Sequence, residues 1–347
     1  MAERDDPLEV LFRPWRAEPP AFESTDRVLF LGARLHPDLA LAAPAALSAA
    51  QPWQPAADAL LAAGIPVSPD DRDLGQGYAS VLVLPERQRD AARAWLGRAV
   101  LAARQGGEVI ACAPTREGGQ RLGDELAELL GEVTIDVKAR CRVVRGVRGP
   151  DADLELAATW ADQDRVREVW RGMSSRPGLF AWDHVDEGSA RLAECLPNDL
   201  GGVVADVGCG WGYLSAAVLA RGVRPTELHL IEADARGLRI AKANLAPHAA
   251  GVALHGHWID ATTKWPVPAL DAIVCNPPFH ERGETSTELG RGILRAAFEA
   301  LKVGGSLWMV ANRHLPYEKT LFQTFGAWDV VDERGGYKVI RATRRKG

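Results

Sequence analysis

The stretch VCNPPFH, residues 274–280, combines residue types that could bind and orient a small polar group. It ends an apolar run with two adjacent prolines, and because proline cannot donate to a β-ladder, a strand must end here. An amide side chain, carbonyls held by proline rings and an aromatic ring fall in the loop that follows. In α/β proteins these loops are the usual place for binding and catalysis. Asn276, Pro277, Pro278 and Phe279 are therefore the first candidate site.

A second candidate is the turn DVGCGWG, which places Gly208, Gly210 and Gly212 between an expected strand and an expected helix. Glycine lets the backbone turn sharply and approach a ligand closely, and the helix amino terminus adds the positive end of its dipole. Dinucleotide-binding enzymes share this spacing, so the glycines alone do not discriminate. Asp206 stands just before the turn, and Glu232 ends the next expected strand, where its carboxylate could accept hydrogen bonds from ribose hydroxyls.

This pattern resembles the S-adenosylmethionine site of class I methyltransferases. The resemblance implies that the cofactor lies against the turn and the two acids. In that family an acid or amide at the position of Asp260 meets the adenine edge. The predicted cofactor-binding residues are Asp206, Gly208, Cys209, Gly210, Gly212, Glu232, Ala233, Asp260, Ala261 and Asn276.

The tetrad from Asn276 to Phe279 resembles the (Asn/Asp)-Pro-Pro-(aromatic) motif of methyltransferases that act on planar nitrogens. An exocyclic amine conjugated to a ring is a poor nucleophile, because its lone pair is delocalised. The Asn276 side-chain oxygen and a proline-fixed backbone carbonyl can accept its two N–H groups and so direct the lone pair toward the methyl donor. Phe279 can stack on the base, an interaction worth about 1–3 kcal/mol. This chemistry needs no strong general base, so His280 is interpreted as a loop or substrate contact.

In the carboxyl-terminal half, expected strands alternate with expected helices, and these elements position the candidate residues. Expected strands lead into the glycine turn, into an amphipathic helix after Glu232 and into the tetrad. A long helix over 286–305, a strand over 306–313 and a hairpin that turns at Gly335-Gly336 complete the half. This alternation implies right-handed βαβ units and a mostly parallel sheet. The resemblance to class I methyltransferases implies that this sheet has seven strands.

The amino-terminal half repeats this plan more faintly. Each half contains a strand ending in proline, a helix, a Gly-Gly pair and another strand: SVLVLPE to EVIACA in the first, DAIVCNPPF to SLWMVA in the second. We interpret the likeness as an internal duplication. The first copy has Leu84-Pro85-Glu86 instead of the tetrad and FLGARLH instead of the glycine turn. It therefore lacks the residues that carry the chemistry.

The predicted fold class is α/β, with two tandem Rossmann-like class I methyltransferase domains. Residues 1–165 form the degenerate domain, with a role in RNA recognition or stabilisation, and residues 166–347 form the catalytic domain. Between the halves, a charged and partly helical connector is expected before the segment Ser-Ser-Arg-Pro-Gly at 174–178.

Composition limits the class of protein and its partners. The 347 residues are 47% hydrophobic and 25% charged, which is typical of a globular protein of two domains. A net charge of −5 excludes a global basic field, so nucleic acid has to be held by local basic patches. Five scattered cysteines without a CxxC pair argue against disulfides and structural zinc and favour a reducing cytoplasm. The acidic amino terminus and the apolar run broken by Pro44 predict no signal peptide and no membrane span. We expect no metal and no membrane partner.

Longer segments narrow the resemblance to the bacterial ribosomal RNA guanine-N2 methyltransferases of the RsmC/RlmG type. NPPFH, VANRHLPY, FQTFG and GGYKVIRATR are similar to the family's catalytic half, and RPGLFAWDHVDEGSARLAECLP is similar to its entry segment. CAPTREGGQRL and KARCRV resemble, more loosely, a Gly-Glu-Asn-Arg-x-Gly segment and an Arg-Cys pair of its first domain. The first of these is reduced here to Ala-Pro-Thr-Arg116, and Trp182, Asp183 and His184 depart from the family's spacing.

The resemblance implies methyl transfer from S-adenosylmethionine to the N2 amine of a specific guanine in ribosomal RNA, with S-adenosylhomocysteine as the other product. The target base would be flipped into a pocket beside Phe279. The overall acidity favours a ribosomal subunit or an assembly intermediate over naked RNA as the substrate. The predicted substrate contacts are His280, Arg140, Arg142, Arg145 and Arg344.

Three alternatives stay open. A protein-glutamine N5 methyltransferase uses the same tetrad on a side-chain amide, but such enzymes usually carry a small helical amino-terminal domain instead of a second α/β unit. A non-catalytic RNA-binding assembly factor on this fold would not need an intact glycine turn and tetrad. A DNA amine methyltransferase would need a target-recognition segment, and we identify none in the sequence.

Overall fold

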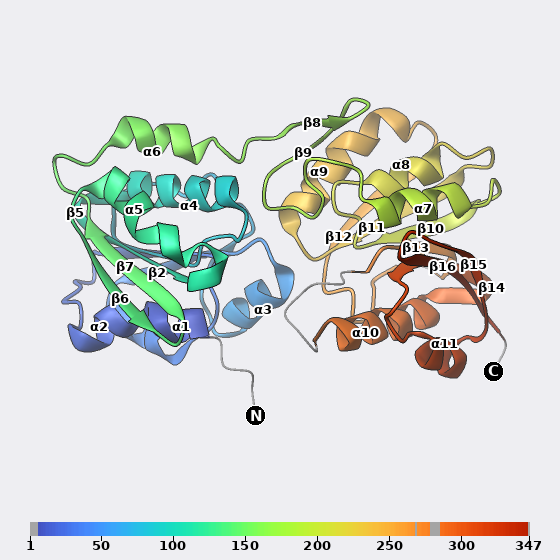
Figure 1. The fold of residues 1–347 in the computed structure, drawn as a ribbon, viewed down its shortest axis with the longest axis horizontal. Coiled ribbons are helices and arrows are strands. Elements are labelled where there is room, and N and C mark those ends of the chain that lie inside the picture. Colours follow the sequence, from blue (N-terminus) through green and yellow to red (C-terminus); the bar gives the residue numbers. More distant parts are fainter. Residues whose placement is uncertain (1–5, 268, 278–284, 346–347) are drawn as a thin grey trace. The chain divides into compact units, whose positions relative to one another are not determined.

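The protein is described by a computed structural model covering residues 6–267, 269–277 and 285–345. Internal contacts divide the chain into two compact units, which we describe separately (Figure 1). The first unit contains Met1–Val166 and Arg176–Gly178, and the second contains Arg167–Ser175 and Leu179–Gly347. All five cysteines are free thiols. Within the described ranges, no helix combines the length and apolar character that a membrane span requires.

The first unit is built on a seven-stranded sheet with the order β3-β2-β1-β4-β5-β7-β6. Only β7 runs antiparallel to its neighbours. Its strands are β1 Arg27–Leu31, β2 Ala46–Ala50, β3 Val67–Ser68, β4 Tyr78–Val83, β5 Ala103–Pro114, β6 Val133–Lys138 and β7 Cys141–Val147. Its α-helices are α1 Asp6–Leu11, α2 Arg13–Ala17, α3 Gln54–Ala62, α4 Arg89–Ala102, α5 Gly119–Leu130 and α6 Leu154–Ala161, with 3₁₀ turns η1 Pro37–Ala42 and η2 Thr115–Glu117.

The second unit repeats this topology, with the strand order β12-β11-β10-β13-β14-β16-β15 and β16 antiparallel to its neighbours. The strands are β10 Gly202–Val207, β11 Pro225–Glu232, β12 Ala253–Trp258, β13 Leu270–Cys275, β14 Leu301–Asn312, β15 Gly326–Arg334 and β16 Tyr337–Arg344. The helices are α7 Glu187–Cys195, α8 Tyr213–Leu219, α9 Ala235–Leu245, α10 Thr285–Ala300 and α11 Glu318–Thr324, with the 3₁₀ turn η3 Ala246–His248.

Both faces of the second sheet are covered, because alternate residues of its strands belong to two different cores. In β13, Ala272 and Val274 pack in one core, and Ile273 and Cys275 pack in the other. Helices α7, α8 and α9 lie over the first face, and α10 and α11 lie over the second (Figure 1). Parallel strands buried on both faces have nearly continuous apolar sequences, which explains why β10 and β13 are recognisable in the sequence.

The segment between the halves differs from its prediction. A charged, partly helical connector is expected there, but helix α6 ends at Ala161 and the chain then forms a two-stranded antiparallel hairpin. Its strands are β8, Arg167–Trp170, and β9, Met173–Ser175, and Gly172 at the turn has a φ of 80°. Left-handed residues at a tight turn are typical of hairpins. The prediction of helix in this charged stretch is therefore wrong.

Candidate functional site

The predicted cofactor and amine residues meet at one edge of the second sheet, because neighbouring parallel strands end there in register. Val207, the last residue of β10, pairs with Ile231 of β11 on one side and with Cys275 of β13 on the other. The next residue of each strand is Gly208, Glu232 and Asn276, respectively. The carboxyl edge of the sheet therefore carries the glycine turn, an acid and an amide side by side.

The glycine turn leaves open space on the side of the loop where a ligand would bind. Gly208, Gly210 and Gly212 have φ values of 69°, 52° and 96°, a region that favours glycine. A Cβ at Gly208 would lie 3.8 Å from the Asn276 carbonyl oxygen, and one at Gly210 would have no neighbour within 4 Å. At Gly212, in contrast, a Cβ would lie 3.3 Å from the Cα of Ala241. The first two glycines thus border free space, and the third serves helix packing.

The Glu232 side chain fixes the glycine turn by hydrogen bonds. Its carboxylate accepts hydrogen bonds from the backbone N–H of Gly210 and of Asp234, both at 2.8 Å. The side chain is buried, and this burial raises the pKa of Glu232 to about 7. The acid therefore changes its protonation state near neutral pH, where hydrogen-bond donors from a ligand would stabilise the ionised form.

Asp206 is a buried acid with one unsatisfied oxygen. Its Oδ2 accepts hydrogen bonds from the Ser215 backbone N–H at 2.9 Å and from the Ser215 hydroxyl at 2.7 Å. Its Oδ1 has no hydrogen-bond partner among the described residues. Burial raises the pKa of Asp206 to about 6. An unpartnered buried carboxylate oxygen is costly, so a ligand that offers a donor or a positive charge fits this position.

Asn276 is oriented by two residues for which sequence reasoning predicted no role. Its Nδ2 donates to Asp186 Oδ2 at 2.9 Å and to Ser189 Oγ at 2.8 Å. Asp186 also caps helix α7 by accepting from the Ser189 backbone N–H at 2.8 Å. Because a carboxylate can only accept, this contact fixes which end of the amide faces Asp186. The Asn276 Oδ1 atom is buried and has no partner among the described residues, which leaves it as a directed acceptor.

A helix-start pattern in the sequence contains these two residues. The segment VDEGSARL places an aspartate three residues before a serine, an arrangement typical of a helix amino terminus. Only the tertiary structure shows that this cap also reaches Asn276, 90 positions further along the chain.

Three other predicted cofactor residues are placed by contacts within their own loops. The Asp260 Oδ1 atom accepts from the backbone N–H and hydroxyl of Thr262 at 2.8 and 2.7 Å. The carbonyls of Ala233 and Ala261 accept from the indole N–H groups of Trp258 and Trp265. These bonds fix the loops after β11 and β12 at the same sheet edge as the glycine turn.

Cys209 is buried within the glycine turn. Burial raises the pKa of its thiol well above the ordinary value, so the side chain is a neutral thiol rather than a nucleophile. In the tetrad, Pro277 is buried directly after Asn276, while Pro278, Phe279 and His280 lie outside the described residues. Their predicted roles therefore stay predictions.

The arginines predicted to contact RNA have different surroundings. Arg145 bonds Glu108 at 2.7 Å and Glu18 at 3.0 Å, and Arg344 donates to the Glu299 carbonyl and lies over the Phe298 ring. Protein groups thus already engage the side chains of Arg145 and Arg344. Arg142 donates to the Gln120 carbonyl at 3.1 Å, and Arg140 is exposed.

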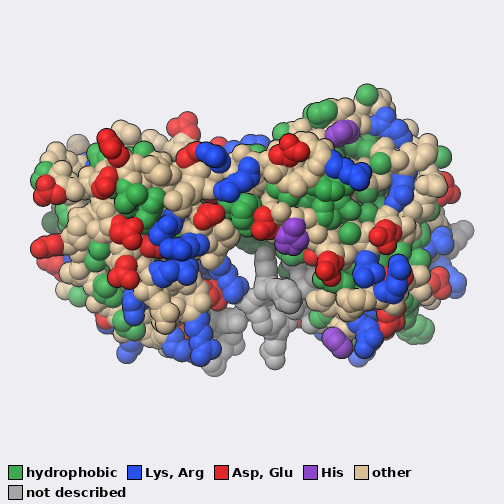
Figure 2. Space-filling model, turned by 45° about the horizontal axis from the view of Figure 1, so that its top comes forward, with side chains coloured by type: hydrophobic (Ala, Val, Ile, Leu, Met, Phe, Trp, Pro, Cys, Tyr) green, Lys and Arg blue, Asp and Glu red, His purple; other side chains and the backbone are tan. Residues whose placement is uncertain are grey.

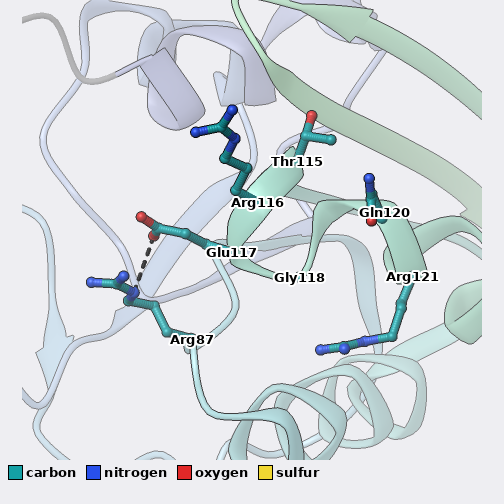
Figure 3. A pocket seen from close by; sticks show the side chains of 7 residues that line it. All are labelled: Arg87, Thr115, Arg116, Glu117, Gly118, Gln120 and Arg121. Carbon is teal, nitrogen blue, oxygen red and sulfur yellow. Dashed lines mark ion pairs between the residues drawn. The ribbon is translucent and has the colours of Figure 1, made fainter.

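A basic pocket lies beside this segment in the first unit (Figure 3). Its volume is about 490 Å³, and it lies where β5 leads through η2 into helix α5. Thr115 links it to the predicted RNA segment, because its N–H and hydroxyl both donate to the Arg140 carbonyl at 2.8 Å. Three arginines and one glutamate contribute charge to the lining, which consists of Arg87, Thr115, Arg116, Glu117, Gly118, Gln120 and Arg121.

Comparison with known proteins gives consistent matches. The family described as Methyltransferase small domain matches residues 171–341. The chain is 34% identical over 240 residues to the ribosomal RNA small subunit methyltransferase C of Sodalis glossinidius (strain morsitans), covering 68% of this chain and 66% of that protein. It is 31% identical over 236 residues to the protein of the same name from Salmonella newport (strain SL254), covering 68% and 67%. The chain thus aligns with about two thirds of the length of these relatives, which are named for ribosomal RNA and not for a protein or DNA substrate.

A solved structure resembles the whole chain. The T. thermophilus 16S rRNA N2 G1207 methyltransferase (RsmC), in complex with AdoMet and guanosine, matches with a TM-score of 0.79 and 23% identity. The match covers 99% of this chain and 92% of that chain. At this identity the likeness shows the fold alone. It confirms the predicted fold class of two tandem methyltransferase-like domains.

Proposed function

Because the chain belongs to the family of ribosomal RNA small subunit methyltransferases C, we propose that it transfers a methyl group from S-adenosylmethionine to the N2 amine of a guanine in small-subunit ribosomal RNA. The observation that carries the proposal is the orientation of Asn276. Its Nδ2 is held by Asp186 and Ser189, which leaves the buried Oδ1 as an acceptor at the carboxyl edge of the sheet. An acceptor fixed in this way suits an N–H donor such as an exocyclic amine.

The residues at this edge also suit the cofactor. S-adenosylmethionine supplies an electrophilic methyl group when it is bound. The open space at Gly208 and Gly210 would accommodate it, and the Glu232 carboxylate, which accepts from the Gly210 N–H, would also accept from ribose hydroxyls. The positive charge of the bound cofactor would favour the ionised form of Asp206, whose Oδ1 has no partner among the described residues.

The chain's own contribution to the reaction is alignment. Asn276 Oδ1 and the Pro277 carbonyl accept the two N–H groups of the amine, which directs the nitrogen lone pair toward the methyl donor. No side chain has to remove a proton before transfer, because the methylated nitrogen is acidic and loses its proton to water. The predicted division assigns this chemistry to residues 166–347 and RNA contact to residues 1–165.

The basic pocket of the first unit is the proposed contact for the RNA backbone. On the face shown in Figure 2, acidic and basic side chains are interspersed, so a phosphate has to be attracted locally. Arg87, Arg116 and Arg121 line the pocket at the amino terminus of the 12-residue helix α5, and both features favour an anion. Because the net charge of −5 disfavours tight binding to naked RNA, we propose a structured ribosomal particle in the cytoplasm as the substrate.

The function is tested by nucleoside mass spectrometry of both ribosomal RNAs from a strain that lacks the gene. We expect N2-methylguanosine to decrease by one residue per small-subunit RNA, to return with the native chain, and to stay absent with Asn276→Ala. Unchanged N2-methylguanosine in both RNAs would overturn the proposal.

The RNA contact is tested separately with the double variant Arg116→Ala, Arg121→Ala. We expect weaker binding to small-subunit particles and a salt dependence reduced by about one unit of slope per lost phosphate contact. Arg165→Ala is the matched control, because Arg165 is an exposed arginine of the same unit that pairs with the nearby Asp162 at 3.5 Å. Equal salt slopes for the native chain and the double variant would remove the pocket from the proposed RNA surface.

A further inference from the structure

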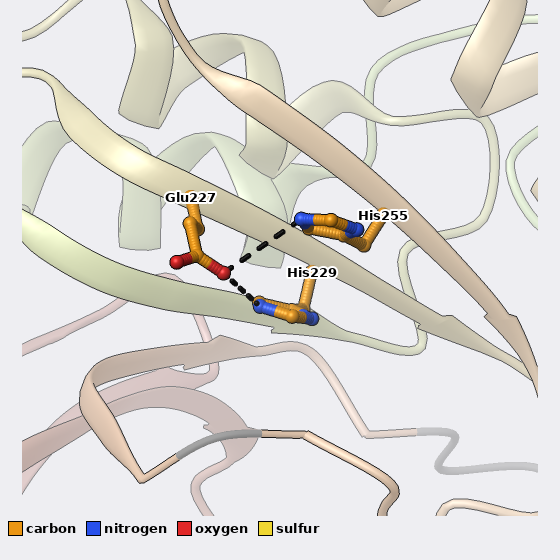
Figure 4. A group of neighbouring side chains, drawn as sticks. All are labelled: Glu227, His229 and His255. Carbon is orange, nitrogen blue, oxygen red and sulfur yellow. Dashed lines mark hydrogen bonds and ion pairs between the residues drawn. The ribbon is translucent and has the colours of Figure 1, made fainter.

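Histidine and glutamate side chains gather on strands β11 and β12 of the second unit (Figure 4). The register pairs His229 with His255 directly, and Glu227 lies two residues before His229, on the same face of the sheet. One ligand atom from each of these three residues lies within 4.8 Å of the others. The Glu227 Oε2 atom is 3.3 Å from His229 Nε2 and 3.7 Å from His255 Nε2.

Two of the three side chains on this face of β11 and β12 reach solvent. Leu228 and Leu230, which alternate with the cluster, point to the opposite face and pack in the core with Leu238 of α9. Between β12 and β13, the described residues 259–267 and 269 contain no helix. His229 is buried, with 3% of its surface exposed, while His255 is exposed and Glu227 is half-buried. The cluster thus has a fixed inner side chain and two outer side chains that solvent can reach.

The geometry points to a site for a divalent transition-metal ion of the Zn²⁺ class, with Glu227 Oε2, His229 Nε2 and His255 Nε2 as ligands. Two imidazoles and a carboxylate form an established ligand set for zinc. Ligand bonds of 2.0–2.2 Å separate tetrahedral ligand atoms by about 3.4 Å, close to the two distances measured from Glu227. The rings of His229 and His255 are stacked with centroids 4.7 Å apart. Ion binding therefore requires the exposed His255 ring to rotate out of the stack.

A fourth residue orients the buried ligand. His229 Nδ1 lies 2.9 Å from His257 Nε2, so a proton on Nδ1 can be donated to His257 and Nε2 is then free for the ion. Metal-bound histidines almost always have such a partner on the second ring nitrogen.

The position of the site suggests a structural role rather than a catalytic one. His229 precedes Glu232 by three residues, which is roughly 10 Å along the strand, and the two side chains point to opposite faces. β12 is the edge strand of the sheet and pairs only with β11 among the described strands. An ion held by residues of both strands would fasten this edge.

The test uses the full-length, untagged chain, freed of metal by dialysis against a chelator and then titrated with ZnCl₂ or CoCl₂. We expect one Zn²⁺ per chain by elemental analysis and the visible absorption of Co²⁺ with nitrogen and oxygen ligands. We also expect the melting temperature to rise with added Zn²⁺. His255→Ala, which changes an exposed residue, should remove the Co²⁺ spectrum and the thermal shift. His257→Ala should weaken binding by about 10–100-fold.

His248→Ala is the control, because His248 is exposed in the same unit but outside the cluster. It should bind the ions like the native chain. Failure of the native chain to bind Zn²⁺ in one-to-one ratio, or equal binding by His255→Ala, would overturn the inference. Neither result bears on methyl transfer, so this inference and the proposed function fail independently.

Discussion

In the first unit Phe30 occupies the place that Asp206 takes in the second, and Leu84 the place of Asn276. The correspondence follows from the register, because Leu31 pairs with Val83 as Val207 pairs with Cys275. Phe30 and Leu84 belong to one apolar core of the first unit. The same positions of one topology thus carry an acid and an amide in one unit and apolar side chains in the other.

The third corresponding pair is Gln51 and Glu232, which follow the paired residues at the ends of β2 and β11. Each accepts a hydrogen bond from the backbone N–H two residues later, at 2.9 Å for Gln51 and 2.8 Å for Glu232. The second bond is reversed: the Gln51 Nε2 donates to the Ala33 carbonyl, whereas Glu232 accepts from Gly210. The amide keeps the loop in place without burying a charge.

The glycines that follow β1 and β10 show that the first unit lacks the open space for a ligand as well as the polar side chains. Gly32 and Gly208 both have φ values of 69°. A Cβ at Gly32 would lie 2.7 Å from the Trp95 ring and 2.6 Å from the Leu84 carbonyl, while the nearest atom at Gly208 would be 3.8 Å away. The Trp95 ring of α4 fills the space that stays open in the second unit. The comparison therefore predicts cofactor binding in the second unit only.

The largest effect should come from the pair Asn276→Ala and Leu84→Ala. Asn276→Ala removes the directed acceptor, so we expect kcat to fall by about 10²–10³-fold or more with the affinity for S-adenosylmethionine retained. Leu84→Ala removes a buried side chain and should lower the free energy of unfolding by about 2–5 kcal/mol. Tritiated-methyl transfer and calorimetry separate the two effects. A fully active Asn276→Ala variant would contradict the proposed role of the Asn276 amide in aligning the amine.

The next effect tests the residue that orients Asn276. Asp186→Ala removes a helix cap and the acceptor for the Asn276 amide, and we expect kcat to fall by about 10–100-fold because the amide can then rotate. Asp153→Ala in the first unit is the matched control, since Asp153 caps α6 with the same 2.8 Å bond to a backbone N–H. Both variants should lose about 1 kcal/mol of stability. If both variants lost the same activity, the role of Asp186 would be limited to capping helix α7.

Much of this comparison could be predicted from the sequence, because its determinants are local. Buried parallel strands are apolar runs, prolines end them, and glycines mark the turn before α8, so the order of elements and the site at the sheet edge were predicted. The helix boundaries were less accurate. The sequence predicts a helix over 286–305, whereas α10 ends at Ala300 and Leu301 already pairs with Leu270 of β13. Here pairing with a neighbouring strand decides the boundary, and no local signal shows it.

Contacts between distant segments account for what the sequence did not predict. The role of Asp186 depends on a side chain 90 positions away. The cluster of His229 and His255 arises from the strand register, and the prediction of no metal considered only the spacing of cysteines. Trp95 looks like an ordinary helix residue until the structure shows the glycine on which it packs.

A smaller effect is expected for the pH dependence of cofactor binding, in which Glu232 is compared with Gln51. The ionised Glu232 carboxylate is the form that accepts from ligand hydroxyls, and with a pKa of about 7 its ionised fraction rises between pH 6 and pH 8. We therefore expect the Kd of S-adenosylmethionine to decrease about tenfold over this range. Asp206, with a pKa of about 6, adds to the change mainly near pH 6. Glu232→Gln should bind more weakly and with a flatter pH profile in calorimetry.

The reverse change, Gln51→Glu, is the control for that series. It places a carboxylate oxygen against the Ala33 carbonyl and should destabilise the first unit by about 1–3 kcal/mol without altering the pH profile of cofactor binding. A native Kd that is constant between pH 6 and pH 8 would show that the protonation of Glu232 is not linked to cofactor binding.

The smallest effect on activity is expected for alanine at Gly208, compared with alanine at Gly32. Both substitutions place a side chain at a φ of 69°, which costs about 1–2 kcal/mol. Gly32→Ala also presses on Trp95 and the Leu84 carbonyl, which adds about 1–3 kcal/mol of overpacking. Denaturant unfolding should therefore show the larger loss of stability for Gly32→Ala. Calorimetry should show a few-fold weaker binding of S-adenosylmethionine for Gly208→Ala alone, because only there does the added methyl enter open space. Weaker cofactor binding by Gly32→Ala would mean that the first unit still takes part in cofactor binding, and the distinction between the two sheet edges would fail.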